Sequence, residues 1–278
     1  MDGAFSIGNS QQRYRAEPQA NPVQKLIAPP RIRRFSRGET ICEPGLSNLV
    51  GCVVEGTIKL VSYLPDGHTN IVGVIEAPGF FGRVFDVSAE FCVEAATDVV
   101  LACVERAAFE TLLAERPELE HLIHMENLCQ LDDAHERILV LACQNTMQRL
   151  ATFMVLRLLT SEIRLGRARE AGLIHVPINR RDFASYLGTT VETVSRNLQA
   201  LVRRGTITII DSSNFRVTAR NDLFRVASQD EDDLCDMIRS RRPAMRELSS
   251  LFARSVQERG QTVATVALDT SAMAVAAE

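Results

Sequence analysis

Residues 179–205 constrain the fold more than any other stretch, because they read as two short helices joined by a glycine turn. Asn179 or a neighbour can cap the first helix, and Thr189 or Thr190 can cap the second through a side-chain oxygen. Gly188 supplies the tight turn between them, since glycine adopts backbone angles that other residues avoid. Two helices connected in this way predict a helix-turn-helix.

The second of these helices has a polar side suited to contacts with bases. Glu192, Ser195 and Arg196 share the exposed side near the helix start, where a recognition helix meets the major groove. Arg196 can donate two hydrogen bonds to guanine, Glu192 can accept one from cytosine, and Ser195 can do either. Contacts with the phosphate backbone are expected from Arg180, Arg181, Thr190, Thr193, Gln199, Arg203 and Arg204.

A short hairpin is expected directly after the second helix. Residues 206–210 and 215–218 are strand-like runs separated by the turn sequence DSSN, which predicts the wing of a winged helix. Polar residues at helical spacing also occur on any solvated helix, so the reading face alone is weak support. The turn, the wing and the flanking arginines together favour DNA binding.

The first third of the chain has a different pattern. Residues 31–104 consist of short strand-like runs separated by turn signals such as Pro78-Gly79. Strands at roughly 8 to 12 residue spacing predict an antiparallel sandwich or roll.

A long helix is expected between these two regions. Pro117 suits a first helical turn, and apolar residues then recur at three- and four-residue steps to about residue 142. The members of this seam are Leu122, Met125, Cys129, Asp132, Glu136, Leu139 and Cys143. The seam can pack on the chain's own β-domain or on a second copy, and periodicity alone does not choose between them. The carboxylates of Asp132 and Glu136 would weaken a dimer or make it pH-sensitive.

Composition excludes several classes of protein. The chain is 46% hydrophobic and 24% charged, as in ordinary globular proteins, and no apolar run approaches the roughly 20 residues of a membrane span. A net charge of −4 argues against indiscriminate coating of nucleic acid. The amino terminus lacks the pattern of a secretion signal, so we expect a cytoplasmic protein. The sequence has no glycine-rich phosphate loop, nucleophile motif or HExxH motif, and we do not expect an enzyme.

The segments RDFASYLG (residues 181–188) and VETVSR (residues 191–196) resemble the Fnr/FixK branch of the Crp/Fnr superfamily of bacterial transcription regulators. Over residues 30–220 the resemblance implies an α+β fold with a cyclic-nucleotide-binding-like β-roll, a long dimerisation helix and a winged helix-turn-helix. It also implies a homodimer that binds a palindrome related to TTGAT-N4-ATCAA, with Glu192, Ser195 and Arg196 reading each half-site. Contacts with RNA polymerase and control of low-oxygen, redox or nitrogen-related genes are further implications.

Two departures from the family pattern concern ligands. Cyclic-nucleotide-binding members have a Glu after a turn glycine and an Arg-Ser pair downstream, whereas this chain has Arg83 after Gly82 and then Ala89-Glu90. A cyclic nucleotide is therefore not expected. No cysteine precedes Cys42, so an amino-terminal [4Fe-4S] cluster of the Fnr type is not expected either.

The seven cysteines leave a metal site open as an alternative. Cys42, Cys52, Cys92 and Cys103 could hold zinc or iron and sulfur if the fold gathered them, but no CxxC pair is present and buried thiols are the simpler interpretation. A second candidate set is His121, His124, Cys129 and His135, for which a solvated helix is the simpler interpretation. The alternative function is a sensor whose β-roll binds a metal, haem or small molecule and so switches DNA binding.

The expected domains are a flexible arm (1–28), the β-roll (29–116), the dimerisation helix (117–143), the winged helix-turn-helix domain (144–220) and a carboxy-terminal extension (221–278). In the extension, Pro243 could open a helix whose apolar face includes Leu248 and Phe252. Residues 261–278 are expected to be disordered.

Overall fold

The computed structural model describes residues 30–45, 48–65, 67, 69–85, 91–165, 172–240, 247–250 and 252. The predicted arm and tail, at residues 1–28 and 261–278, lie outside this part of the chain. No helix in the described part is long and apolar enough to cross a membrane.

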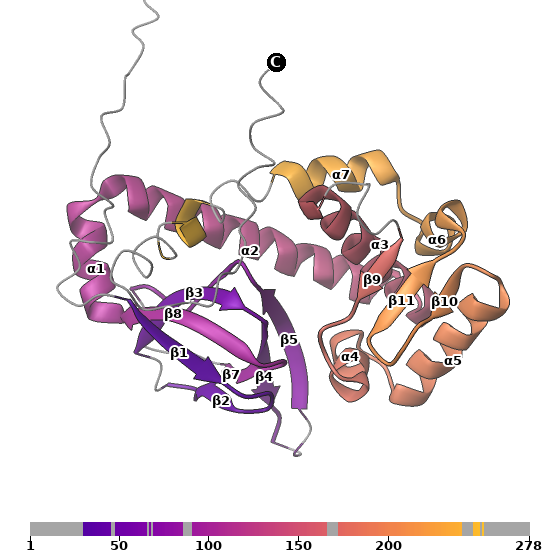
Figure 1. The fold of residues 1–278 in the computed structure, drawn as a ribbon, viewed down its shortest axis with the longest axis horizontal. Helices are drawn as coiled ribbons and strands as arrows, with labels where there is room; N and C mark the ends of the chain where they lie inside the picture. Colours follow the sequence, from indigo (N-terminus) through magenta and orange to yellow (C-terminus); the bar gives the residue numbers. More distant parts are fainter. Residues whose placement is uncertain are drawn as a thin grey trace, which may run out of the picture.

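The β-roll consists of two four-stranded antiparallel sheets (Figure 1). In spatial order, the first sheet contains β1 (Arg31–Phe35), β8 (Val99–Glu105), β3 (Leu49–Glu55) and β6 (Gly79–Phe81). The second contains β2 (Thr40–Cys42), β7 (Cys92–Ala95), β4 (Thr57–Tyr63) and β5 (Thr69–Glu76). In the second sheet β5 is an edge strand, so one side of its backbone has no strand partner.

Strand β8 shows how the sequence produces two cores. Its side chains alternate between the two faces of the first sheet, and both faces are covered. Leu101 and Cys103 pack between the sheets, whereas Ala102 and Val104 face the helices that follow.

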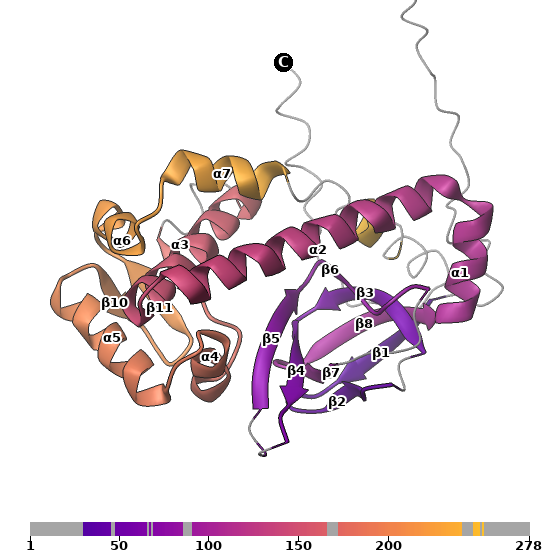
Figure 2. The same ribbon diagram turned by 180° about the vertical axis from the view of Figure 1, so that it is seen from behind.

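Those helices are α1 (Arg106–Glu115) and α2 (Pro117–Cys143). Pro117 occupies the first turn of α2, where its missing N–H is not needed. Leu119 and Ile123 bury the start of α2 against the β-roll, and the helix then runs to the second domain (Figure 2).

The second domain is mainly helical. Its elements are α3 (Thr146–Leu165), β9 (Leu173–His175), α4 (Arg180–Tyr186), α5 (Val191–Arg203), β10 (Ile207–Ile209), β11 (Asn214–Val217), α6 (Arg220–Ala227) and α7 (Glu231–Ser240). The three short strands form one antiparallel sheet in the order β10-β11-β9. The α+β architecture of β-roll, long helix and winged helix-turn-helix is confirmed, and α6 and α7 supply the helical extension.

The end of the described chain returns to the β-roll. Residues 247–250 and 252 are helical, and Leu248 and Phe252 are each 1% exposed. They pack on the outer face of the first sheet, where the rings of Phe252 and Phe109 lie 5.8 Å apart between centroids. The apolar face expected in this segment therefore belongs to the core of the β-roll.

Candidate nucleic-acid interface

Local hydrogen bonds set the two helices of the helix-turn-helix. Asn179 caps α4, since its side-chain oxygen accepts from the backbone N–H of Asp182 at 2.9 Å. Thr190 caps α5 by accepting from the N–H of Thr193 at 3.3 Å. Between them, Gly188 has a φ of +62°, which a side chain would strain. Each feature that predicted the motif thus has a physical role in it.

Helix α5 has one buried side and one exposed side. Val194, Leu198 and Leu201 lie in the core of the second domain. The polar residues Glu192, Ser195, Arg196 and Gln199 are all exposed on the other side. The structure therefore brings the three predicted base-reading residues together on one open face.

Hydrogen bonds organise this open face before any ligand arrives. Arg196 donates to the hydroxyl of Thr193 at 3.2 Å, and that hydroxyl lies 3.1 Å from the hydroxyl of Thr190. Hydrogen bonds from its own backbone and from Thr190 lower the pKa of Glu192 below its usual value. Glu192 is therefore a carboxylate at neutral pH, able to accept hydrogen bonds but not to donate them.

The residues predicted to contact phosphates divide into two groups. Arg181, Gln199 and Arg203 are exposed beside the reading face. Arg180 is half-buried, donates to the carbonyl of Ser212 at 3.2 Å and lies over the ring of Phe215, so it supports the wing. Burial lowers the pKa of Arg180, in keeping with this structural position.

Arg204 is held by an ion pair. Its guanidinium lies 3.0 Å from the carboxylate of Asp222, which also binds the Thr206 hydroxyl and Arg225. These contacts lower the pKa of Asp222 and raise that of Arg204. The neighbouring arginines at the end of α5 are both exposed, but Arg204 is already paired with the carboxylate of Asp222.

The wing is formed by β10, β11 and the turn between them. Asp211 fixes this turn by accepting from the backbone N–H groups of Ser213 and Asn214 at 2.8 and 2.9 Å. This is the hairpin expected after the second helix, although its first strand is shorter than predicted and its second begins and ends one residue earlier.

Helix α4 lies against the free edge of β5 in the β-roll (Figure 1). The hydroxyl of Ser185 accepts from the backbone N–H of Ile71 at 3.0 Å. The carbonyl of Ile71 accepts from Arg137 on α2, which also donates to the carbonyl of Tyr186 at 3.1 Å. Side chains from two helices thus satisfy the backbone groups that an edge strand leaves open.

A partly buried ion-pair cluster also joins the two domains. Lys59 on β4 lies 2.9 Å from Asp182 on α4 and 3.1 Å from Glu94 on β7. The three side chains are only 12–14% exposed. Burial by itself lowers the pKa of Lys59, but the hydrogen bonds to Asp182 and Glu94 outweigh it and the pKa is raised.

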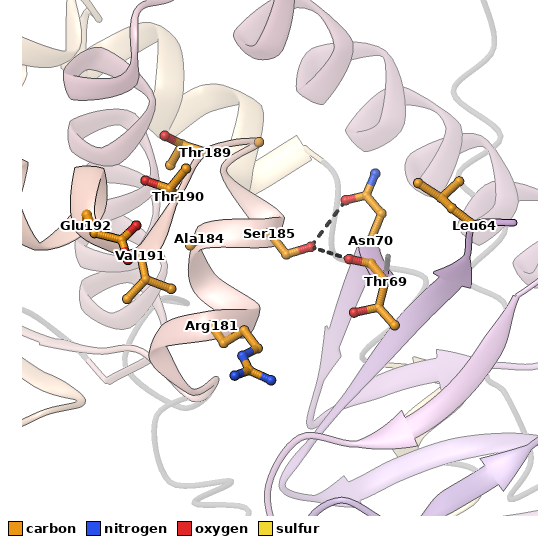
Figure 3. A pocket seen from close by; sticks show the side chains of 11 residues that line it. Leu64, Thr69, Asn70, Arg181, Ala184, Ser185, Thr189, Thr190, Val191 and Glu192 are labelled. Atoms are coloured by element: carbon orange, nitrogen blue, oxygen red, sulfur yellow. Dashed lines mark hydrogen bonds between the residues drawn. The ribbon is translucent and has the colours of Figure 1, made fainter. Parts of the chain in front are cut away.

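An open groove separates the tip of the β4–β5 hairpin from the start of α5 (Figure 3). Leu64, Thr69 and Asn70 line it on the hairpin side, and Ser185 reaches across to Thr69 and Asn70. Glu192 lines the opposite side. The β-roll therefore meets the helix-turn-helix beside its reading face.

Two protein-family models match this chain. A Crp-like helix-turn-helix domain matches residues 148–226, and a cyclic nucleotide-binding domain matches residues 32–116. A probable transcriptional activator of Rhizobium leguminosarum bv. viciae is 31% identical over 197 residues, which cover 70% of this chain and 81% of the relative. The chain belongs to the Crp/Fnr family.

Two further relatives place it near the FixK regulators within the Crp/Fnr family. The nitrogen fixation regulation protein FixK of Bradyrhizobium diazoefficiens is 32% identical over 63% of this chain and 73% of its own length. The structure of FixK2 from Bradyrhizobium japonicum has a TM-score of 0.64 at 25% identity, and the match covers 72% of this chain and 98% of that one. The helix-turn-helix is accordingly a DNA-binding module, and these relatives are transcription regulators rather than enzymes.

In cyclic-nucleotide-binding members a glutamate is expected after the turn glycine, for which the counterpart here is Gly82. Gly82 has a φ of +97°, and a Cβ there would meet the carbonyl of Leu49 at 2.6 Å, so only glycine fits. The next residue is the cation Arg83. Ala89 and Glu90 lie outside the described residues.

The four cysteines considered as metal ligands do not converge. Cys52 faces the helices, Cys42 and Cys103 lie between the sheets, and Cys92 belongs to a separate cluster. Burial raises the pKa of Cys52 to about 12 and that of Cys103 to about 11, which makes both poor metal ligands. Among the described residues of the chain, no group of three or more His, Cys, Asp or Glu could hold a metal ion.

The free side of α2 differs from the predicted seam. We call this side the exposed stripe and define it as His121, His124, Met125, Leu128, Leu131, Asp132, His135, Ile138, Leu139 and Ala142, all of which are exposed. The apolar members Leu128, Leu131, Ile138 and Leu139 are 50–61% exposed.

Of the predicted seam, Met125, Asp132, Leu139 and Cys143 are exposed, whereas Leu122, Cys129 and Glu136 are half-buried. The predicted seam and the exposed stripe are centred on different sides of the helix. At 3.6 residues per turn, the predicted seam is rotated from the exposed stripe by about a quarter of a turn toward the body of the protein. The rotation arises because Leu122 packs on the β-roll core.

The residues that join the domains were not predicted from the sequence, and neither were three apolar members of the exposed stripe. Asp182 and Ser185 matter because β4 and β5 lie opposite them, which no local pattern reveals. Leu128, Leu131 and Ile138 do repeat at helical spacing, but both sides of α2 contain such a repeat.

Proposed function

We propose that this protein is a homodimeric regulator that binds a palindrome related to TTGAT-N4-ATCAA and uses Glu192, Ser195 and Arg196 to read each half-site. The observation that supports this proposal most directly is the exposed face of α5. There, a bidentate donor, a carboxylate acceptor and a hydroxyl lie together, and their buried neighbours hold the helix in place. Arg196 matches the two acceptors of guanine, and Glu192 matches the amino group of cytosine.

The exposed stripe of α2 supports the homodimer. Four large apolar side chains that are at least half exposed in a row are costly in water and gain free energy when a second copy covers them. A two-fold palindrome requires both recognition helices on the same side of the pair. The two α2 helices would therefore run parallel, with their carboxy-terminal ends toward the DNA.

We infer that Arg181, Gln199 and Arg203 contribute most of the phosphate contacts, because they are exposed beside the reading face. Arg180 and Arg204 contribute less, since the wing and Asp222 already hold them.

We also propose that DNA binding needs no cyclic nucleotide or metal in the β-roll. The cation Arg83 in place of an acid and the dispersed cysteines support this view. Exposed β-roll loops are the proposed contacts with RNA polymerase. The proposed target genes serve low-oxygen, redox or nitrogen metabolism, and the name of the FixK relative supports the nitrogen-related part.

The experiment is a salt titration of binding to a TTGAT-N4-ATCAA duplex and to a scrambled duplex, with protein purified without oxygen and then exposed to air. We expect tight, sequence-dependent binding under both conditions. Equal affinity for the two duplexes would refute the proposed half-site. Binding that is lost in air would instead favour an oxygen-labile cofactor in the β-roll.

The dimer is tested by Leu128→Asp, which places a charge in the centre of the exposed stripe. We expect sedimentation to show monomers and affinity for the palindrome to fall at least a hundredfold, because a buried, unpaired carboxylate is costly. Asn127→Asp adds the same charge at an exposed position beside the stripe and should leave both properties close to wild type.

A further inference from the structure

The exposed stripe of α2 contains three of the protein's five histidines. His121, His124 and His135 are all exposed, and they belong to one series with Leu128, Leu131 and Ile138 at steps of three and four residues. This is the spacing of the two inward positions in a coiled-coil heptad. The histidines therefore lie on the same line as the apolar residues expected to contact a second copy.

In a parallel pair, each residue on this line meets its own counterpart across the two-fold axis. Leu128, Leu131 and Ile138 would form apolar layers. The heptad nearest the β-roll is different, because histidine occupies both of its inward positions, 121 and 124. Four imidazoles would then gather at this end of the helix pair.

Four imidazoles at this spacing suit a tetrahedral transition metal. Residues three apart on a helix have neighbouring side chains, about 5–6 Å between Cβ atoms, so both rings can reach one ion. Imidazole nitrogen is a preferred ligand of zinc, which takes four ligands at about 2.0–2.1 Å. We propose that two copies of this chain bind one Zn²⁺ between them through His121 and His124 of each. This inference rests on the proposed homodimer.

The surroundings of the pair favour a cation. Glu120 lies 3.6 Å from the ring of His124, and their side chains are 41% and 61% exposed. A carboxylate in this position can orient a ligating imidazole and increase its basicity.

A second copy is needed to complete the site. One chain supplies two imidazoles, and its described residues contain no larger group of candidate ligands. Because binding requires both copies, the ion stabilises the dimer by linkage and leaves the monomer almost unaffected.

His135 provides a matched control within the same stripe. It occupies an equivalent inward position, but the next inward residues on either side are Leu131 and Ile138. A pair of copies would therefore offer only two imidazoles there. Replacement of His135 removes a histidine from the interface without removing the proposed site.

The test uses the full chain carrying Cys143→Ser, which removes an exposed thiol that could itself bind zinc. Zn²⁺ is titrated by equilibrium dialysis, and the dimer dissociation constant is measured by sedimentation with Zn²⁺ or with a chelator. We expect half a zinc ion per chain and a dimer at least tenfold tighter with Zn²⁺. His135→Ala should behave in the same way, whereas the double variant His121→Ala, His124→Ala should lose both effects. Co²⁺ in place of Zn²⁺ should show the visible absorption of tetrahedral coordination.

Four results would overturn the proposal. One zinc ion per chain would place the site within a single copy, and equal loss in the His135→Ala variant would mean a different set of ligands. A dimer that binds the palindrome but ignores Zn²⁺ would refute the zinc site and leave the proposed function standing. Failure to dimerise under any condition would refute both.

Discussion

The two helices of the helix-turn-helix differ in whether their polar side chains are already bound within the protein. On α4, Asp182 pairs with Lys59 and Ser185 binds the edge of β5, whereas Arg181 remains exposed. On α5, Glu192, Ser195 and Arg196 are exposed. Helix α4 therefore fixes the orientation of the motif on the β-roll, and α5 keeps its polar face open for a ligand.

Polar groups supply much of the contact between α4 and the β-roll, beside the apolar packing of Tyr186. Hydrogen bonds and ion pairs require particular directions and distances, so they define an orientation more sharply than apolar contact does. The β-roll can therefore set the position of α5 through α4 without touching the base-reading residues Ser195 and Arg196.

We expect the greatest loss of DNA affinity from Arg196→Ala, which removes a base-reading side chain from the exposed face of α5. Each half-site should lose about 1–3 kcal/mol of binding free energy, because a bidentate contact with guanine is removed. Fluorescence anisotropy with the palindrome and with single-base variants measures the loss. The variant should also discriminate less at the contacted base pair, and an equal loss on random DNA would contradict the base-reading role.

A charge reversal at Lys59 tests the contact between α4 and the β-roll. Lys59→Glu should destabilise the protein by about 2–3 kcal/mol, because it places three carboxylates together in a partly buried position. Thermal unfolding and affinity for the palindrome should both decline. Adding Asp182→Lys to the same chain should restore much of each loss, since the pair is re-formed with opposite polarity. A double variant no better than the single one would show that the pair does not join the domains.

A smaller effect separates the neighbouring arginines at the end of α5. Arg203→Ala should weaken binding to all sequences alike and reduce the slope of log K against log salt by about two, since each copy loses one phosphate contact. Arg204→Ala should change that slope much less, because Asp222 already neutralises Arg204. Equal slopes for the two variants would mean that Arg204 leaves Asp222 when DNA binds.

The smallest effect concerns acid stability. Hydrogen bonds from Arg204, Thr206 and Arg225 lower the pKa of Asp222, so its ionised form stabilises the fold at pH values above the carboxyl pKa of the unfolded chain, about 3.9. This stabilisation declines as pH falls from there through the lower native pKa. Asp222→Asn should therefore unfold a few degrees earlier at pH 7, with a difference from wild type that shrinks below about pH 4. A constant difference across pH would exclude the carboxylate as its source.

Features that arise within a few residues of each other could be derived from the sequence alone. Asn179, Gly188 and Thr190 act through local hydrogen bonds and backbone angles, so the helix-turn-helix could be predicted together with the exposed face of α5. The division into strands and the long helix followed from strand-like runs between turn signals and from repeats at three- and four-residue steps.

Which surfaces remain open depends on packing between distant parts of the chain. Apolar residues repeat on both sides of α2, and packing of Leu119, Leu122 and Ile123 on the β-roll left the side with Leu128 free. Cys42 and Cys52 are separated because alternation along strands and their packing place them in different cores. The contact between α4 and β5 joins residues more than a hundred positions apart, and hydrogen bonds over such separations leave no local pattern in the sequence.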